Sequence, residues 1–210
     1  MAHPALPTIT VMQAWQVAQP FHHEGWVYEE KYDGCRVVAY KDGRVVRLVS
    51  RNGRDLTHRF PELVAAMAGL KAYTLVLDGE VCRFDDQLVS RVEWLLRQPK
   101  GEPATPALYM VFDCLYARRK DLRDRALRIR RQWLEREVDD QRLILPARRL
   151  APNGLEAWTE VLARGYEGLV GKDPAAPYVG GRSLKWRKVK QPKYREGERG
   201  WEPRPAVRVI

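Results

Sequence analysis

The chain has 210 residues, 45% of them hydrophobic, which suits one large domain or a domain and a half with a buried core. No run of about 18 apolar residues is present and residues 1–10 lack the pattern of a signal peptide, so neither a transmembrane helix nor a secretory leader is expected. The net charge of +10 is concentrated from Gln141 onward, where 15 Lys or Arg stand against 7 Asp or Glu, and this basic third favours a polyanionic partner.

Strands dominate the first half of the chain. Apolar or alternating runs rich in Val, Tyr and Leu predict strands over residues 26–30, 35–40, 45–50, 73–77 and 81–84. Asp42-Gly43 predicts a hairpin turn between the second and third of them. Helical spacing predicts a helix over 60–68, with Thr57 as a candidate N-cap and Gly69 as its end.

The second half mixes helices with further strands. The same patterns predict helices over 91–97, 124–137 and 155–164, and strands over 108–112, 143–145, 169–172 and 184–189. Gly165 is expected to end the last helix, while residues 99–106 and 173–181 are predicted loops. Strand pairs that alternate with isolated helices indicate an α+β domain built on mainly antiparallel sheets.

The cysteines and most tryptophans carry no recognisable site pattern. Cys35, Cys82 and Cys114 lie in apolar strand-like runs without paired spacing, which favours reduced, buried thiols over a disulfide frame or a zinc site. Core or interface packing is expected for the tryptophans outside the motifs described next, namely Trp15, Trp26, Trp94, Trp133, Trp158 and Trp201.

Six short segments, each with at least one charged residue, lie in or next to these strands in a fixed order. They are residues 29–36 (EEKYDGCR), 50–53 (SRNG), 77–80 (LDGE), 109–113 (YMVFD), 167–172 (EGLVGK) and 181–190 (GRSLKWRKVK). In this order they resemble the motifs of ATP-dependent DNA ligases, within the covalent nucleotidyltransferase superfamily that also contains RNA ligases and mRNA capping enzymes. The last segment is most similar to bacterial end-joining and repair ligases, and the resemblance runs from about residue 26 to residue 190.

The resemblance implies a fold and a domain plan. The fold would be α+β, with two mainly antiparallel sheets flanked by helices and a nucleotide cleft between them, an ATP-grasp-like arrangement found in ligase adenylation domains. Residues 1–190 would form the nucleotidyltransferase domain, followed by a polar basic tail over 191–210. Such ligases normally continue into an OB-fold, which about 20 residues cannot build. An excised domain, a naturally reduced enzyme and a subunit completed by another chain all remain open.

Lys31 is the candidate nucleophile. It ends an apolar strand beside Asp33, Gly34 and Arg36, where burial and nearby cations favour the neutral amine that can attack. The resemblance implies that Lys31 takes AMP from ATP as lysyl-AMP. The AMP would then pass to a DNA 5′-phosphate and be displaced by a 3′-hydroxyl.

Lys188 and Lys190 are the other candidate catalytic residues and also candidate nucleotide contacts. Residues two apart in a strand point to the same face, so both amines can reach one phosphate from one side. Lys185 has an odd offset from them and is expected on the opposite face.

The resemblance assigns the remaining site residues. The nucleotide would be bound by Glu29 at the adenine amino group, Phe112 against the adenine face and Glu80 at the ribose. Arg36 would contact the nucleotide or the 5′-phosphate, and Lys172, on the strand of Glu167, is a further phosphate candidate. Arg51 and Arg182 would contact nucleic acid. Glu167, with Glu80 as a second candidate, would hold Mg²⁺ or Mn²⁺, which prefer hard oxygen ligands.

The expected function is therefore an ATP-dependent DNA ligase that seals 5′-phosphate/3′-hydroxyl nicks in DNA repair. Its partners would be nicked or broken double-stranded DNA and, as a further candidate, a separate OB-fold or repair protein. The expected location is the bacterial cytoplasm, at the nucleoid and not at a membrane. The alternatives are an RNA ligase, a capping-type nucleotidyltransferase that uses GTP, and a catalytically weak nucleic-acid-binding module.

Overall fold

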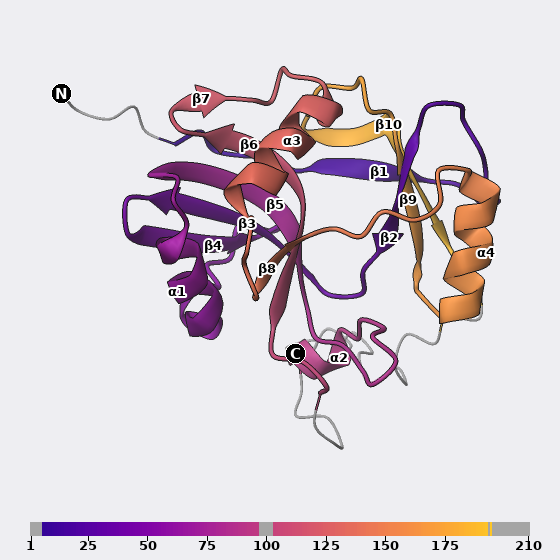
Figure 1. Cartoon of the computed structure of the whole chain (residues 1–210), viewed down its shortest axis with the longest axis horizontal. Helices are drawn as coiled ribbons and strands as arrows, with labels where there is room; N and C mark the ends of the chain where they lie inside the picture. The colour runs from indigo at the N-terminus through magenta and orange to yellow at the C-terminus, as the bar shows by residue number, and fades with distance from the viewer. Residues whose placement is uncertain (1–5, 97–102, 193, 195–210) are drawn as a thin grey trace, which may run out of the picture.

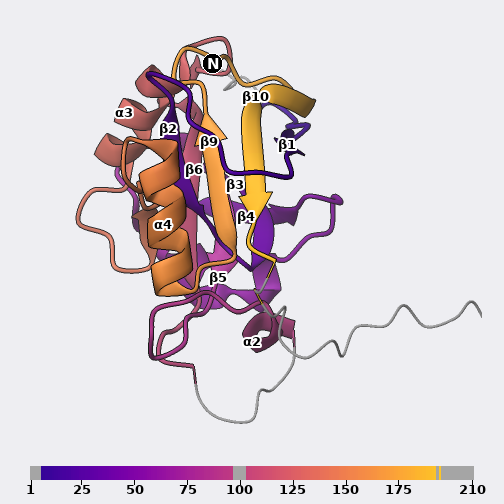
Figure 2. The same cartoon turned by 90° about the vertical axis from the view of Figure 1, so that its right-hand side faces the viewer.

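The computed structural model describes residues 6–96, 103–192 and 194, which form two facing sheets with helices on their outer sides (Figures 1 and 2). The expected tail beyond residue 194, including Trp201, lies outside the described residues. So do the last residue of the predicted 91–97 helix and part of the predicted 99–106 loop. None of the described helices is long and apolar enough to cross a membrane.

The smaller sheet has the strand order β1-β10-β9-β2. Its strands are β1 (Met12–Gln16), β2 (Val27–Lys31), β9 (Gly168–Lys172) and β10 (Gly181–Lys190). Neighbouring strands are antiparallel except β1, which runs parallel to β10. Segments from both ends of the described chain therefore lie side by side in this sheet.

The larger sheet has the order β4-β3-β5-β6-β7, with β8 paired parallel to β6. Its strands are β3 (Cys35–Asp42), β4 (Val45–Ser50), β5 (Thr74–Cys82), β6 (Leu108–Ala117), β7 (Lys120–Asp121) and β8 (Ile144–Pro146). Along β3 the side chains of Val37 and Ala39 enter the outer core, whereas Val38 enters the core between the sheets. This alternation turns Arg36 toward the inner side.

Helices cover the outer faces of both sheets. They are the short η1 (Thr57–Arg59), α1 (Pro61–Gly69), α2 (Glu93–Leu96), α3 (Leu127–Glu137) and α4 (Gly154–Arg164). Side chains of α1 and α3 pack in the outer core of the larger sheet, and those of α4 pack on the smaller sheet. The sheets meet through a separate core that includes Met12, Val76, Leu115, Tyr178 and Trp186.

Several predicted boundaries were wrong. Asp78-Gly79-Glu80 does not separate two strands but lies inside the continuous strand β5, because β3 and β6 pair with β5 on both sides. This pairing overrides the low strand propensity of Asp and Gly. Gly79 is required there, since a Cβ atom would lie 2.6 Å from the ring of Tyr109.

Other differences concern the ends of elements. The strand β1 was not predicted, and β6 continues to Ala117 instead of ending at residue 112. Thr57 does not cap α1: the N-cap is Phe60, and the Thr57 hydroxyl accepts a hydrogen bond from the Leu48 amide. Gly165 does end α4, in the left-handed conformation (φ 71°) that glycine adopts at low cost.

Candidate active site

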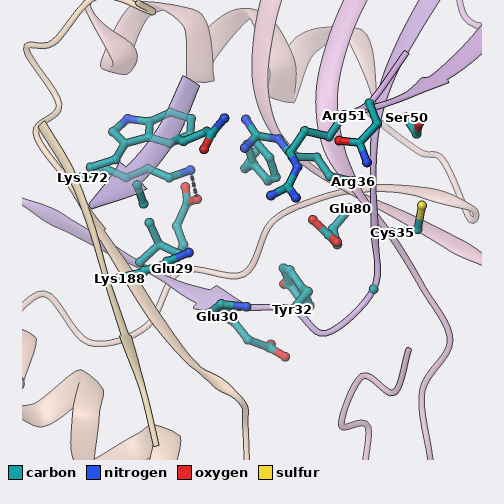
Figure 3. Close-up of a pocket in the computed structure, with 18 residues that line it drawn as sticks. Glu29, Glu30, Tyr32, Cys35, Arg36, Ser50, Arg51, Glu80, Lys172 and Lys188 are labelled. Atoms are coloured by element: carbon teal, nitrogen blue, oxygen red, sulfur yellow. Dashed lines mark hydrogen bonds and ion pairs between the residues drawn. The ribbon is translucent and has the colours of Figure 1, made fainter. Parts of the chain in front are cut away.

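A cleft of about 420 Å³ opens between the two sheets (Figure 3). Most of the predicted site residues line it, namely Glu29, Lys31, Arg36, Arg51, Glu80, Phe112, Lys172 and Lys188. The smaller sheet contributes the lysines, and the larger sheet contributes Arg36, Glu80 and Phe112. Residues far apart in the sequence are thus brought to one cavity.

The register of the smaller sheet aligns the lysines. Lys31 pairs with Gly168 on β9, and Gly168 pairs with Lys190 on β10. In the next row on the same face, Glu29, Val170 and Lys188 are neighbours in the same way. The predicted shared face of Lys188 and Lys190 is confirmed by this register. A side chain at position 168 would not fit, because its Cβ atom would lie 2.0 Å from the Val189 carbonyl oxygen.

Glu167 joins two of these lysines. Its Oε2 atom lies 2.5 Å from the Nζ atom of Lys31, and its Oε1 atom lies 2.9 Å from that of Lys190. Burial and the nearby charges of Lys31 and Lys190 lower the pKa of Lys188, against the opposing effect of Glu167. The buried carboxylate therefore holds the amines of Lys31 and Lys190 close together, and the Lys188 amine lies within reach of their charges.

Glu80 lies across the cleft from this row. Burial raises the pKa of Glu80 to about 8, although the charges of Lys31 and Arg36 act in the opposite direction. In the described part of the chain its carboxylate makes no ion pair. A carboxyl group that lines a cleft without a direct ion-pair partner is suited to bind a cation or a hydroxyl group of a ligand.

The inner end of the cleft contains a buried lysine between two aromatic rings. The Nζ atom of Lys172 lies 4.6 Å from the ring centre of Phe112 and 4.3 Å from that of Trp186. It also lies 2.5 Å from Glu29 Oε2, while Glu29 Oε1 lies 3.3 Å from Arg131. Burial lowers the pKa of Lys172, opposed by Glu29. Glu29 and Lys172 thus form one buried ionic cluster.

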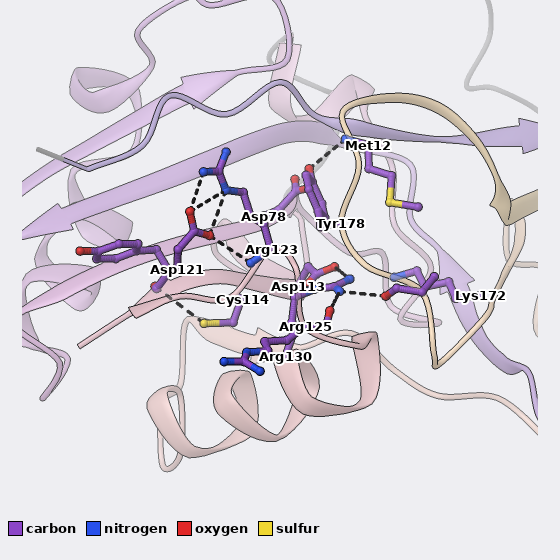
Figure 4. A network of polar contacts seen from close by, with 12 residues as sticks. Met12, Asp78, Asp113, Cys114, Asp121, Arg123, Arg125, Arg130, Lys172 and Tyr178 are labelled. Carbon is purple, nitrogen blue, oxygen red and sulfur yellow. Dashed lines mark hydrogen bonds and ion pairs between the residues drawn. The ribbon is translucent and has the colours of Figure 1, made fainter. Parts of the chain in front are cut away.

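A polar network not predicted from the sequence holds Arg36 (Figure 4 shows the part around Asp78 and Tyr178). The guanidinium of Arg36 donates to both carboxylate oxygens of the buried Asp78, at 3.0 and 2.7 Å. The Tyr178 hydroxyl donates to Asp78 at 2.6 Å and accepts from the Met12 amide at 2.9 Å. This arrangement places the Arg36 guanidinium 5.2 Å from the centre of the Phe112 ring.

Asp33 anchors the loop after Lys31 through hydrogen bonds of its amide and its carboxylate. Its amide donates to the Ser90 hydroxyl at 2.8 Å, and its carboxylate accepts from the Tyr194 hydroxyl at 3.2 Å. Tyr194 also donates to the Ser90 carbonyl at 2.8 Å. Tyr194, shortly after β10, therefore packs against the loop that follows the candidate nucleophile.

Some predicted residues lie outside the cleft or differ from expectation. Arg182 lines an adjoining hollow, together with Trp15, which is 44% exposed and not in the core. Lys185 faces solvent and pairs with Asp173 at 3.0 Å. The cysteines are free, as predicted, but Cys35 is only half-buried and lines the cleft.

Glu30 lies between Glu29 and Lys31 on β2, and its side chain points to the face of the strand opposite to theirs. Its carboxylate is 3% exposed, Oε2 lies 3.1 Å from Arg148, and Oε1 has no hydrogen-bond partner within the described residues. Burial raises the pKa of Glu30 from 4.5 to about 8, against the opposing charge of Arg148. Between these two pH values the folded state keeps a proton that the unfolded state loses, so this group lowers stability as the pH rises.

We expect Glu30→Gln to flatten the pH dependence of stability. The neutral amide removes a loss of up to about 1.4 kcal/mol per pH unit between pH 4.5 and pH 8. Denaturant unfolding of both proteins across this range measures the effect. Parallel curves for the wild type and the variant would show that Glu30 is ionised in the folded protein.

The sequence also matches a family model. Residues 7–190 match the model described as the ATP dependent DNA ligase domain. The chain therefore belongs to the ATP-dependent DNA ligase domain family, as its motifs predicted. The expected α+β fold with two mainly antiparallel sheets is likewise confirmed.

Curated relatives and solved structures agree with this membership. The chain is 35% identical over 176 residues to the multifunctional non-homologous end joining protein LigD of Pseudomonas aeruginosa, covering 83% of the chain and 21% of that protein. It is 34% identical to DNA ligase C1 of Mycolicibacterium smegmatis, covering 85% of the chain and 56% of that protein. A mycobacterial DNA ligase D complexed with ATP and MES superposes with a TM-score of 0.74 at 29% identity, covering 86% of the chain and 60% of that structure. The chain thus spans between about a fifth and somewhat over half of these proteins.

Proposed function

We propose that this chain is the nucleotidyltransferase domain of an ATP-dependent DNA ligase that seals 5′-phosphate/3′-hydroxyl nicks in DNA repair. The observation that carries this proposal is that Lys31 and Lys188 line one cleft together with Glu80 and Phe112, while the strand register brings Lys190 beside Lys31 through Gly168. The domain would cover residues 1–190, with 191–210 as a polar basic tail. The domain would act in the cytoplasm, at the nucleoid.

Lys31 would perform the first step. Its amine attacks the α-phosphorus of ATP, a P–N bond forms, the bond to the bridging oxygen breaks, pyrophosphate leaves, and the nitrogen gives up its protons to Glu167, 2.5 Å away, or to solvent. Negative charge spreads over the non-bridging oxygens, and preorganised cations stabilise it. Lys188 and Lys190 lie on the same face as Lys31 and would supply these charges.

The following steps would use the same cations. The DNA 5′-phosphate attacks the phosphorus of lysyl-AMP and the P–N bond breaks, which returns the amine of Lys31. The 3′-hydroxyl then attacks the 5′-phosphate and AMP leaves. Arg51, at the rim of the cleft, and Arg182, in the adjoining hollow, would contact the nucleic acid.

The nucleotide would lie along the inner end of the cleft. Phe112 lines the cavity and would stack on adenine, a contact worth about 1 kcal/mol beyond burial. Arg36, held by Asp78, and Lys172, held by Glu29, would present fixed donors to the nucleotide. Glu29 would accept from the adenine amino group in addition to its two cations.

Glu80 and Glu167 are the proposed metal ligands, for Mg²⁺ or Mn²⁺. Glu80 fits a divalent cation, since its carboxylate lines the cleft and makes no ion pair with the described residues, and a bound cation would favour its ionised form. Glu167 fits less directly, because both of its oxygens contact lysines and one contact must be released or shared. When bound, the metal would withdraw negative charge from phosphate oxygens.

Incubation with nucleotide tests this proposal. We expect the purified chain, given ATP and Mg²⁺, to gain the mass of AMP on the tryptic peptide that contains Lys31, and GTP to give no labelling. Transfer to nicked DNA, compared with a nicked RNA duplex, then reports the substrate class. Labelling by GTP would favour a capping-type enzyme, RNA preference would favour an RNA ligase, and no labelling would leave a binding module.

A further inference from the structure

A second hollow of about 810 Å³ adjoins the cleft. It is bounded by β1, by the turn after β4 and by β10. Gln13, Ala14, Arg51, Asn52 and Lys188 line both cavities, so the two are continuous. A ligand that fills the cleft can therefore extend into this hollow without leaving the protein surface.

The charges on the hollow have one sign. Arg51, Arg182 and Lys188 line it, and none of the described residues that line it is acidic. Burial and the charges of Lys31, Lys190 and Arg51 all lower the pKa of Lys188, which reflects how closely the cations gather here. A ligand with repeated negative charge, such as a phosphodiester chain, complements this surface.

The partly exposed indole ring of Trp15 lines the same hollow as these cations. Trp15 lies on β1, where the register with β10 shifts between Ala14 and Trp15. Met12, earlier on the same strand, is fully buried in the core between the sheets, whereas Trp15 remains 44% exposed. The Arg182 guanidinium lies 5.9 Å from the centre of an indole ring of Trp15. An exposed aromatic ring beside arginines in an electropositive groove is the arrangement with which proteins bind single-stranded nucleic acid.

We propose that the hollow binds a nucleic-acid strand leaving the cleft, and that Trp15 stacks on an unpaired base of this strand. The inference rests on the proposed function, since the strand is the one whose 5′-phosphate or 3′-hydroxyl reacts in the cleft. A base inside a continuous duplex is covered by its neighbours on both sides. Only a base at a gap, an overhang or a frayed end offers its face to an indole.

The proposal predicts a difference between two DNA probes. One is a fully paired nicked duplex, and the other is the same duplex with a single-stranded gap of several nucleotides. Trp15→Ala should weaken binding to the gapped duplex by roughly 5- to 150-fold, the usual contribution of one stacked base. It should leave the affinity for the nicked duplex within error of the wild type. Trp15→Phe should restore most of the affinity, because the phenyl ring also stacks.

Salt dependence separates stacking from charge. Trp15→Ala removes no charge, so the slope of log affinity against log salt should not change. Arg182→Gln should lower this slope by about 0.7 to 0.9, the contribution of one phosphate contact. Leu184→Ala is the matched control, since Leu184 is 59% exposed on β10 and lines neither cavity. Thermal melting confirms that each variant is folded.

The outcomes separate this inference from the function on which it rests. If the wild type takes up AMP and binds both probes, equal losses on the two probes, or no loss, would overturn the stacking role of Trp15 alone. The same holds if Leu184→Ala weakens binding as much as Trp15→Ala. If the wild type takes up no AMP and binds neither probe, the proposed function fails and the inference fails with it.

Discussion

Replacing Lys31 by alanine is expected to abolish covalent attachment of AMP while leaving the fold intact. The amine of Lys31 is the nucleophile of the proposed reaction, and it lies at the end of β2 where its side chain is 18% exposed. Without it no P–N bond can form at this position. Intact-mass measurement after incubation with ATP and Mg²⁺ is the direct assay, and circular dichroism verifies folding.

Lys31→Arg is the matched control for charge. Arginine keeps a cation beside Glu167, which contacts Lys31 at 2.5 Å, but a guanidinium remains protonated and does not attack phosphorus. Both variants should therefore remain unlabelled, and Lys31→Arg should be the more stable of the two. Persistent AMP on either variant would place the nucleophile at another residue.

Replacing Lys188 or Lys190 by alanine is expected to slow AMP attachment by about two orders of magnitude or more. Each lysine would be a preorganised charge stabiliser, and the loss of one such group typically costs about 3 kcal/mol. Single-turnover kinetics of AMP attachment with ATP measures both variants. Lys190→Ala should also alter Glu167, since Lys190 contacts its Oε1 atom at 2.9 Å.

Lys185→Ala provides the control on the same strand. The Lys185 side chain is 61% exposed and pairs with Asp173, whereas Lys190 pairs with Glu167 beside Lys31. We expect its rate to stay close to that of the wild type. Equal losses in all three variants would indicate a general effect of basic charge on this strand and would refute a specific phosphate clamp.

The sequence predicted correctly those helices and strands whose residue pattern along the chain agrees with their packing in the fold. The hairpin of β3 and β4 and the helix α4 follow directly from alternation, helical spacing and the stop at Gly165. The continuity of β5 could not be read locally, because it depends on backbone pairing with two strands that come from other parts of the chain. The strand β1 owes its conformation to β10, which lies more than 160 residues further along.

In the site, too, some features could be predicted from the sequence and others could not. The two-residue repeat of side-chain direction in a strand was enough to place Lys188 and Lys190 on one face. The order of the motifs pointed to most of the residues that line the cleft. The partners that hold them were not predicted. Asp78 and Tyr178 come together across 100 residues, and Arg131 reaches Glu29 across 102. A contact between such distant residues leaves no periodic signal in a sequence.

The hydroxyl of Tyr178 has a consequence for how the protein receives its ligand. It connects the amide of Met12 in the smaller sheet to Asp78 in the larger one, and its ring packs edge-on against Trp186 at 6.0 Å. Together with the core between the sheets, this phenol therefore sets the spacing of the two sheets before a ligand binds. A preset gap requires little reorganisation on binding, so more of the contact energy remains available for affinity. A preset spacing would also favour a flat ring over a bulkier group at this end of the cleft.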